Sequence, residues 1–154
     1  DTGYAQLIEE IDKTEGSKPI AVIFNLGVND LGNAGNYVSY MTNIASTLKS
    51  KNCKLFYMSV NPINSIMITK AGRGARTEAQ VREFNSKIRS GLSLYYKYID
   101  MYSVLMKKGY GTNARYDGVD DGDDGLHYTT KTFKRIYYYC ITYLNTGSIN
   151  ASYY

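Results

Sequence analysis

The sequence contains no tryptophan, a single histidine and two cysteines, and none of its apolar runs is long. Every apolar stretch falls well short of the roughly 20 residues that cross a bilayer, so we expect a soluble chain that does not enter a membrane. The opening residues, DTGYAQ, are neither a signal peptide nor a natural initiator sequence. We therefore expect that the N-terminus has been trimmed.

The few cysteines and the dispersed charge narrow the range of functions further. Cys53 and Cys140 lie far apart in apolar stretches, without the Cys-x-x-Cys or Cys/His spacing of a zinc or redox site. We expect two buried free thiols and no metal. The net charge of +4 comes from 18 basic residues that never form a run longer than two, so we expect neither nucleic acid nor a membrane surface as partner.

Apolar residues make up 44% of the 154 residues, which is enough for the core of one domain spanning 1–154. The runs at 20–26 and 54–60 are short, apolar and rich in β-branched and aromatic side chains, as parallel strands buried on both faces are. A third strand is expected at 98–101. No internal repeat or linker divides the chain.

Apolar residues at helical spacing separate these strands. One helix is expected around 4–11, a second around 37–48 as the crossover between the first two strands, and a third after a capping box of Thr77 and Gln80. The last helix begins near Thr130. Its apolar face is predicted to pack on the sheet and consists of Phe133, Ile136, Tyr137, Cys140, Ile141 and Leu144.

The expected order is therefore α-β-α-β-α-β-loop-α. This alternation predicts an α/β fold, a three-layer α/β/α arrangement around a doubly wound parallel sheet. Ligands of such folds bind beyond the carboxyl ends of the strands, so functional residues are expected just after positions 26, 60 and 101. A flavodoxin-like cofactor domain would share this fold, but no strand end carries a GxGxxG or Walker pattern, and we expect no cofactor.

Gly27-Val28-Asn29-Asp30 follows the first strand directly. Gly27 lets the backbone approach a substrate closely, and the side-chain amide of Asn29 is a neutral donor of the kind that stabilises the oxyanion of a tetrahedral intermediate. These residue types are also ordinary turn formers that would cap the next helix. On its own, this segment does not distinguish an oxyanion hole from an ordinary turn. A second motif with catalytic residues is needed to decide.

Asp124-Gly125-Leu126-His127 precedes the last helix and contains the only histidine. An imidazole can take a proton from a serine near neutral pH and return it to a leaving alcohol. Asp124, three residues earlier across a turn, is placed to accept the N–H of the other ring nitrogen. Two other interpretations stay open: a histidine that caps the helix, and a calcium site formed by the carboxylates of 117–124.

Together the two motifs resemble the SGNH/GDSL hydrolase family. FNLGVND is similar to its Gly-x-Asn-Asp block and DGLHYT to its Asp-x-x-His block before the closing helix, in the same order and at a similar separation. Between them, SVNP after the second strand and a helix carrying FNSKI look like the arrangement in small secreted bacterial members. The likeness extends from about residue 3 to residue 144.

The resemblance implies a flavodoxin-like SGNH hydrolase fold in which Asn29 belongs to the oxyanion hole, His127 is the general base and acid, and Asp124 orients it. It implies further oxyanion or substrate-binding positions at Gly27, Gly3 and Asn61. The family's Gly-Asp-Ser block, on a first strand in the middle of the sheet, is absent from this chain. An N-terminal segment or a second chain is therefore expected to supply that strand and the nucleophilic serine.

The expected activity is hydrolysis of short acyl esters, such as acetylated carbohydrate, outside a bacterial cell or at its surface. Four tyrosines are expected around the site, where they either stack on sugar rings or serve as packing and rim residues; they are Tyr4, Tyr110, Tyr116 and Tyr128. Ser59 and Ser65 flank a strand end but do not lie on the strand-to-helix turn that the nucleophile needs. The alternative is an SGNH-like binding or scaffold domain without catalysis.

Overall fold

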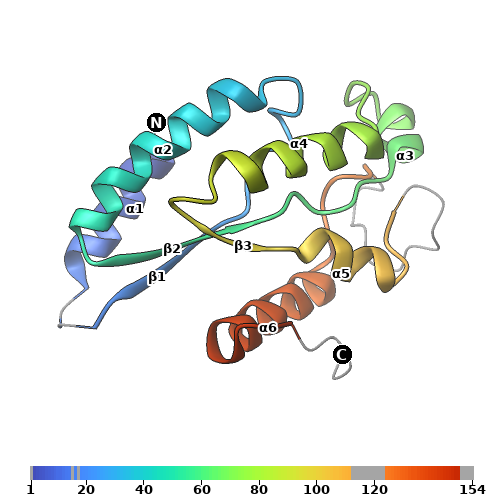
Figure 1. Ribbon diagram of the computed structural model, residues 1–154. Coiled ribbons are helices and arrows are strands. Elements are labelled where there is room, and N and C mark those ends of the chain that lie inside the picture. The colour runs from blue at the N-terminus through green and yellow to red at the C-terminus, as the bar shows by residue number, and fades with distance from the viewer. Residues whose placement is uncertain (1, 15, 17, 112–123, 150–154) are drawn as a thin grey trace.

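A computed structural model of the chain describes residues 2–14, 16, 18–111 and 124–149. Their elements form a mixed α/β fold (Figure 1). In chain order they are α1 (Thr2–Lys13), β1 (Ile20–Phe24), α2 (Ala34–Ser50), β2 (Cys53–Met58), α3 (Ser65–Lys70), α4 (Glu78–Gly91), β3 (Lys97–Ile99), α5 (Met101–Lys107) and α6 (Thr130–Thr146).

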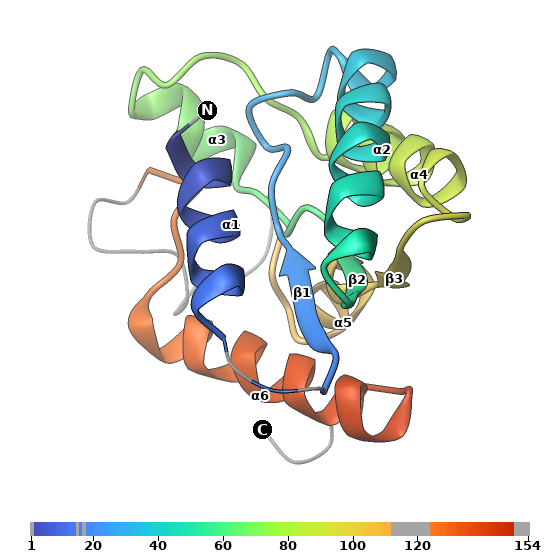
Figure 2. The same cartoon turned by 90° about the vertical axis from the view of Figure 1, so that its left-hand side faces the viewer.

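The described strands form one parallel sheet in the order β1-β2-β3, with Ile20 opposite Cys53 and Phe56 opposite Lys97. The parallel sheet and the crossover helix α2 between its first two strands confirm the α/β class expected from the sequence. Each strand ends two residues earlier than expected, so that Asn25 and Leu26 already belong to the loop beyond β1. Within the described residues β1 has one neighbouring strand and lies at an edge (Figure 2).

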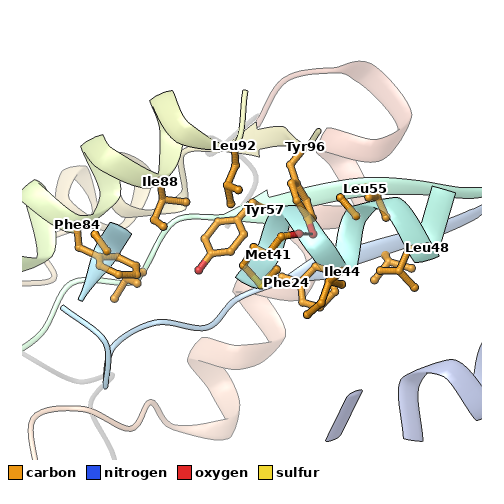
Figure 3. Close-up of a cluster of buried hydrophobic side chains, with 14 of the residues drawn as sticks. Phe24, Met41, Ile44, Leu48, Leu55, Tyr57, Phe84, Ile88, Leu92 and Tyr96 are labelled. Carbon is orange, nitrogen blue, oxygen red and sulfur yellow. Dashed lines mark hydrogen bonds between the residues drawn. The ribbon is translucent and has the colours of Figure 1, made fainter. Parts of the chain in front are cut away.

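Alternate residues of the strands point to two separate hydrophobic clusters. Phe24 and Tyr57 belong to the cluster under α1, α2 and α4 (Figure 3), whereas Phe56, Met58 and Ile99 belong to the cluster that includes residues of α5 and α6. Helices therefore cover both faces of the sheet, with α2 and α4 on one side and α5 and α6 on the other (Figure 1). This arrangement leaves the carboxyl ends of the strands and their loops at one end of the molecule.

The sequence did not indicate α3 and α5, which have six and seven residues. Helices of this length complete too few turns to show a helical apolar period. Both begin at a side-chain cap, because Asn64 accepts from the backbone N–H of Met67 and Asp100 from that of Ser103. The capping box of α4 at Thr77 and Gln80 is present as predicted.

The predicted apolar face of α6 was half wrong. Ile136 and Cys140 are buried against the sheet, but Phe133, Tyr137 and Ile141 are 50%, 61% and 36% exposed. The three exposed residues recur every four positions and form an apolar line along α6, beside the buried line of Ile136 and Cys140. The apolar arc of α6 is therefore wider than the part of it that the described sheet covers.

Two further observations concern the burial of the two cysteine thiols and the length and apolarity of the helices. Cys53 and Cys140 are both buried and free, as predicted. Within the part of the chain that the structure describes, no helix combines the length and the apolarity that crossing a bilayer takes.

Candidate functional site

Asp124 and His127 form a hydrogen-bonded pair just before α6. Nδ1 of His127 lies 2.6 Å from Oδ2 of Asp124. The other carboxylate oxygen, Oδ1, accepts the backbone N–H groups of Leu126 and His127 at 2.9 and 3.0 Å. The side chain of Asp124 thus holds both the backbone and the ring of His127 in place.

The charge of Asp124 fixes the tautomer of His127. Burial by itself would raise the pKa of Asp124, which is 4% exposed, but the backbone N–H groups of His127 and Leu126 and the His127 ring lower this pKa to about 2. An ionised carboxylate can only accept, so Nδ1 of His127 carries the proton. In the neutral ring Nε2 is then the basic nitrogen, and the side chain that presents it is 62% exposed.

Gly125 anchors this segment to α3. It has a φ of +76°, and a Cβ at this position would lie 2.5 Å from the backbone oxygen of Asn64. The backbone oxygen of Gly125 in turn accepts from the N–H of Asn64 at 2.9 Å. Glycine is therefore required both by the backbone conformation and by the close contact. On the other side of His127, the buried Tyr128 donates its hydroxyl to the backbone oxygen of Pro62.

The segment after β2, on which the Asp124–His127 pair rests, is itself fixed from α4. Asn85 accepts from the N–H of Val60 and donates to its oxygen, at 2.8 and 2.9 Å. Glu78 accepts from the N–H of Ile63 at 2.7 Å. These contacts give a structural role to Asn85, the asparagine of the FNSKI segment, for which the resemblance implied no role.

Gly27 and Asn29 lie in the loop after β1. Gly27 has a φ of +108°, and a Cβ there would lie 2.5 Å from the ring of Phe84. Packing against Phe84 is thus a reason for this glycine that does not involve a substrate. The N–H of Asp30 donates to the oxygen of Gly27 at 2.8 Å, which closes a turn and carries the exposed Asn29 on its outside.

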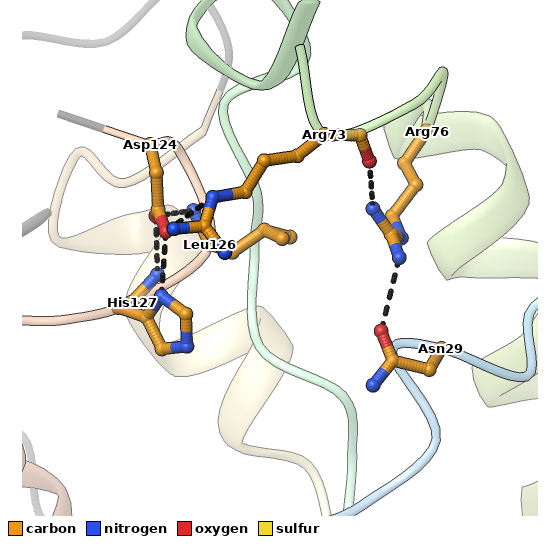
Figure 4. Close-up of polar contacts among 6 residues, drawn as sticks. All are labelled: Asn29, Arg73, Arg76, Asp124, Leu126 and His127. Atoms are coloured by element: carbon orange, nitrogen blue, oxygen red, sulfur yellow. Dashed lines mark hydrogen bonds and ion pairs between the residues drawn. The ribbon is translucent and has the colours of Figure 1, made fainter. Parts of the chain in front are cut away.

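Two arginines of the loop between α3 and α4 connect the two motifs (Figure 4). Nε of Arg73 lies 3.1 Å from Oδ2 of Asp124. Arg76 donates from Nη2 to Oδ1 of Asn29 at 2.9 Å and from Nη1 to the backbone oxygen of Arg73 at 2.6 Å. Neither arginine was predicted as a site residue from the sequence. The loop AGRGAR contains no helical or strand pattern, and its one available signal is a pair of arginines next to a capping box.

Five of the six candidate residues line two adjoining cavities near the loops that follow β1 and β2. The larger, of about 760 Å³, includes Gly3, Gly27 and Asn29 in its lining, and the smaller, of about 250 Å³, includes Asn61 and His127. The two share the lining residues Asn25, Leu26 and Val28. The structure therefore brings all six predicted site residues to one end of the sheet, with Asp124 behind His127.

Asn61 differs from the others in its environment. Its side-chain oxygen is buried, and no described residue donates a hydrogen bond to it. An unpaired buried acceptor is unusual in a folded protein. It lies in the lining of the cavity beside His127, where the resemblance implied a substrate-binding position.

Two of the four tyrosines expected around the site do not stack on a sugar. Tyr110 and Tyr128 are each 5% exposed and pack on one another in the core, so their faces are not open to a ligand. Tyr4 contributes to the lining of the larger cavity. Tyr116 lies outside the described residues, as do residues 117–123 of the acidic cluster considered for calcium. The described residues contain no group of three acidic, histidine or cysteine side chains that could hold a metal ion.

Ser59 is completely buried, and its hydroxyl accepts from the backbone N–H of Tyr102 at 2.7 Å. Ser65 is the first residue of α3. That neither serine is the nucleophile stays a prediction.

Comparison with models of known protein families gave no match, and no curated protein sequence is significantly similar to this chain.

Proposed function

We propose that this chain forms most of a serine ester hydrolase of the SGNH/GDSL type. The observation that carries the proposal is the buried carboxylate of Asp124 bound to Nδ1 of the exposed His127, since this pair has the bonding of the acid and base of a catalytic triad. Asn29, in the loop after the neighbouring strand, supplies an amide donor for the oxyanion. A histidine that only caps the helix does not require a carboxylate bound to its Nδ1.

The proposed reaction has two steps. A serine hydroxyl attacks the ester carbonyl carbon while Nε2 of His127 takes its proton, and the alcohol leaves with that proton as the acyl-enzyme forms. A water molecule then attacks the acyl group, its proton passes to Nε2, and the serine oxygen leaves with it. Asp124 stays ionised throughout and stabilises the imidazolium, and Asn29 donates to the negatively charged oxygen in both tetrahedral intermediates.

We propose that the serine lies on a further strand that pairs with the free edge of β1. The two edges of the described sheet differ. β3 has three residues and begins with the exposed Lys97, features that protect an edge, whereas β1 is the uncharged five-residue sequence IAVIF. Leu26 is 56% exposed beyond β1.

The cavity beside His127 supports the proposed substrate class. Its volume of about 250 Å³ and its largely apolar lining, which includes Leu26, Val28 and Phe133, suit a short acyl group rather than a long chain. Acetyl esters of carbohydrates are the preferred substrates, and an extracellular or cell-surface location is part of the same proposal. The chain is proposed to need no cofactor.

The test is labelling with a fluorophosphonate serine probe, followed by mass spectrometry, on this chain and on a form extended by the serine-bearing segment. We expect an adduct on the added serine alone. Labelling in neither form would favour a binding domain without catalysis, and an adduct within this chain would overturn the nucleophile assignment.

Kinetics of the serine-bearing form test the other two roles. His127→Ala should abolish turnover, and Asn29→Ala should lower kcat by roughly 100-fold with little change in KM, because an oxyanion donor acts on the transition state. Asn43→Ala, at an exposed position of α2, is the matched control and should leave both constants unchanged. Wild-type kinetics in the Asn29 variant would remove this residue from the mechanism.

A further inference from the structure

Arg76 binds three acceptors through three different nitrogen atoms. Nη2 donates to Oδ1 of Asn29 at 2.9 Å, Nη1 to the backbone oxygen of Arg73 at 2.6 Å, and Nε to the backbone oxygen of Val28 at 3.2 Å. The guanidinium group is planar and its donors point in fixed directions. Two of its acceptors, Val28 and Asn29, belong to the loop after β1, so Arg76 holds both the backbone and the side chain of that loop.

The backbone of Arg76 is itself well fixed. The next residue, Thr77, is the N-cap of α4 and forms a reciprocal capping box with Gln80. α4 is anchored in the core by side chains such as Phe84 and Ile88, which are fully buried. The guanidinium group is therefore attached to a rigid element rather than to a free loop.

The orientation of the Asn29 amide follows from the chemistry of its partner. A carboxamide has one end that only accepts and one that only donates, and the torsion that exchanges them is soft. Arginine has donors and no acceptor, so the atom that faces Arg76 has to be the oxygen. The –NH₂ group of Asn29 consequently points away from Arg76, as Figure 4 shows.

We propose that Arg76 is the positioning residue of the oxyanion hole: it holds the Asn29 carboxamide with its –NH₂ group presented to the substrate and its oxygen turned away. This inference rests on the proposed function. A flipped amide would present its oxygen to the developing oxyanion and repel it. The positive charge of Arg76 on the amide oxygen also polarises the –NH₂ group and makes it a stronger donor.

The first test is independent of enzymatic activity and uses the 154-residue chain. The side-chain ¹⁵N–¹H signals of Asn29 are assigned by their disappearance in Asn29→Ala. In Arg76→Ala these signals should move toward the positions of solvent-exposed asparagine amides, whereas Arg89→Ala, at an exposed position of α4, should leave them unchanged. Unchanged Asn29 signals in Arg76→Ala, in a protein whose backbone spectrum shows that it is folded, would overturn the proposal.

The second test is a double-mutant cycle on the serine-bearing form. Arg76→Ala should lower kcat about tenfold with little change in KM, as expected if part of the oxyanion stabilisation is lost. In the Asn29→Ala background the same substitution should have no further effect on kcat, because the group that it positions is gone. Additive losses, or a raised KM with unchanged kcat, would mean that Arg76 acts on the substrate directly.

The two tests separate the failure of this inference from the failure of the proposed function. If the serine-bearing form hydrolyses no ester, the proposed function fails, and the Asn29 signals still decide whether Arg76 orients the amide. If the enzyme is active and the signals do not respond to Arg76→Ala, only the positioning role is refuted.

Discussion

Replacing Asp124 by asparagine should remove a contribution to stability that depends on pH. The buried carboxylate accepts two backbone N–H groups and the His127 ring, and its pKa is lowered from 3.8 to about 2. A carboxyl group whose pKa is lower in the folded state stabilises the fold above its unfolded pKa, and this contribution is lost as the pH falls through the folded pKa. The relevant window therefore extends from about pH 4 down to about pH 2.

The magnitude follows from the size of the shift. A lowering of roughly 2 units corresponds to about 2 kcal/mol of folding free energy at neutral pH, of which about half is lost by pH 3. Asparagine keeps the shape and an accepting oxygen but does not titrate. Asp124→Asn should therefore lower the free energy of unfolding by about 2 kcal/mol at pH 5, and the gap between the two proteins should narrow at pH 3.

The assay is urea denaturation followed by circular dichroism at pH 5, 4 and 3, in the wild type and the variant. Asp12→Asn is the control, since Asp12 pairs with Lys51 at the surface and is expected to contribute little. A gap between wild type and Asp124→Asn that stays constant from pH 5 to pH 3 would refute the reasoning, because it would show that the stabilising contacts do not depend on the charge.

Three further predictions concern the fold. Gly125→Ala should destabilise the chain by about 2 kcal/mol or more in urea denaturation, because the new Cβ would clash with the backbone oxygen of Asn64. The control Gly72→Ala, at a positive φ of +66° with open space around its Cβ, should lower stability by about 1 kcal/mol. Equal losses in the two variants would contradict the clash at Gly125. Tyr57→Phe should lower stability by about 1 kcal/mol, because the hydroxyl donates to a backbone oxygen at 2.7 Å, and an unchanged urea midpoint would argue against this bond. Cys53 and Cys140 should react with a thiol reagent at pH 8 only in urea, because both are buried and burial raises the pKa of Cys140 to about 11; rapid reaction of the native chain would contradict their burial.

The parts of the molecule that could be predicted from the sequence are those in which neighbouring residues decide the outcome. The capping box of Thr77 and Gln80 closes within one helical turn, and the contact of Asp124 with His127 spans three residues. The apolar strands at 20–26 and 54–60 were recognised because burial on both faces leaves a continuous apolar run. Local patterns of this kind do not depend on the rest of the fold.

Contacts between distant segments left no such local signal. Arg76 reaches Asn29 across 47 positions and Arg73 reaches Asp124 across a comparable distance, so neither arginine could be distinguished from a solvated charge. The face of α6 was misjudged for a related reason. Its apolar residues cover a wide arc, and the sequence of the helix does not state how much of that arc the sheet covers, so Tyr137 was expected to be buried and is 61% exposed.

The open edge of β1 has a consequence for handling the chain. Within the described residues no strand pairs with one side of β1. An uncharged apolar strand with such an edge is a template for pairing with any other extended segment, including the same strand of a second molecule. The isolated chain should therefore self-associate as its concentration rises, and dilution or an added lysine within β1 should oppose this. A short peptide that pairs with this edge should likewise oppose self-association.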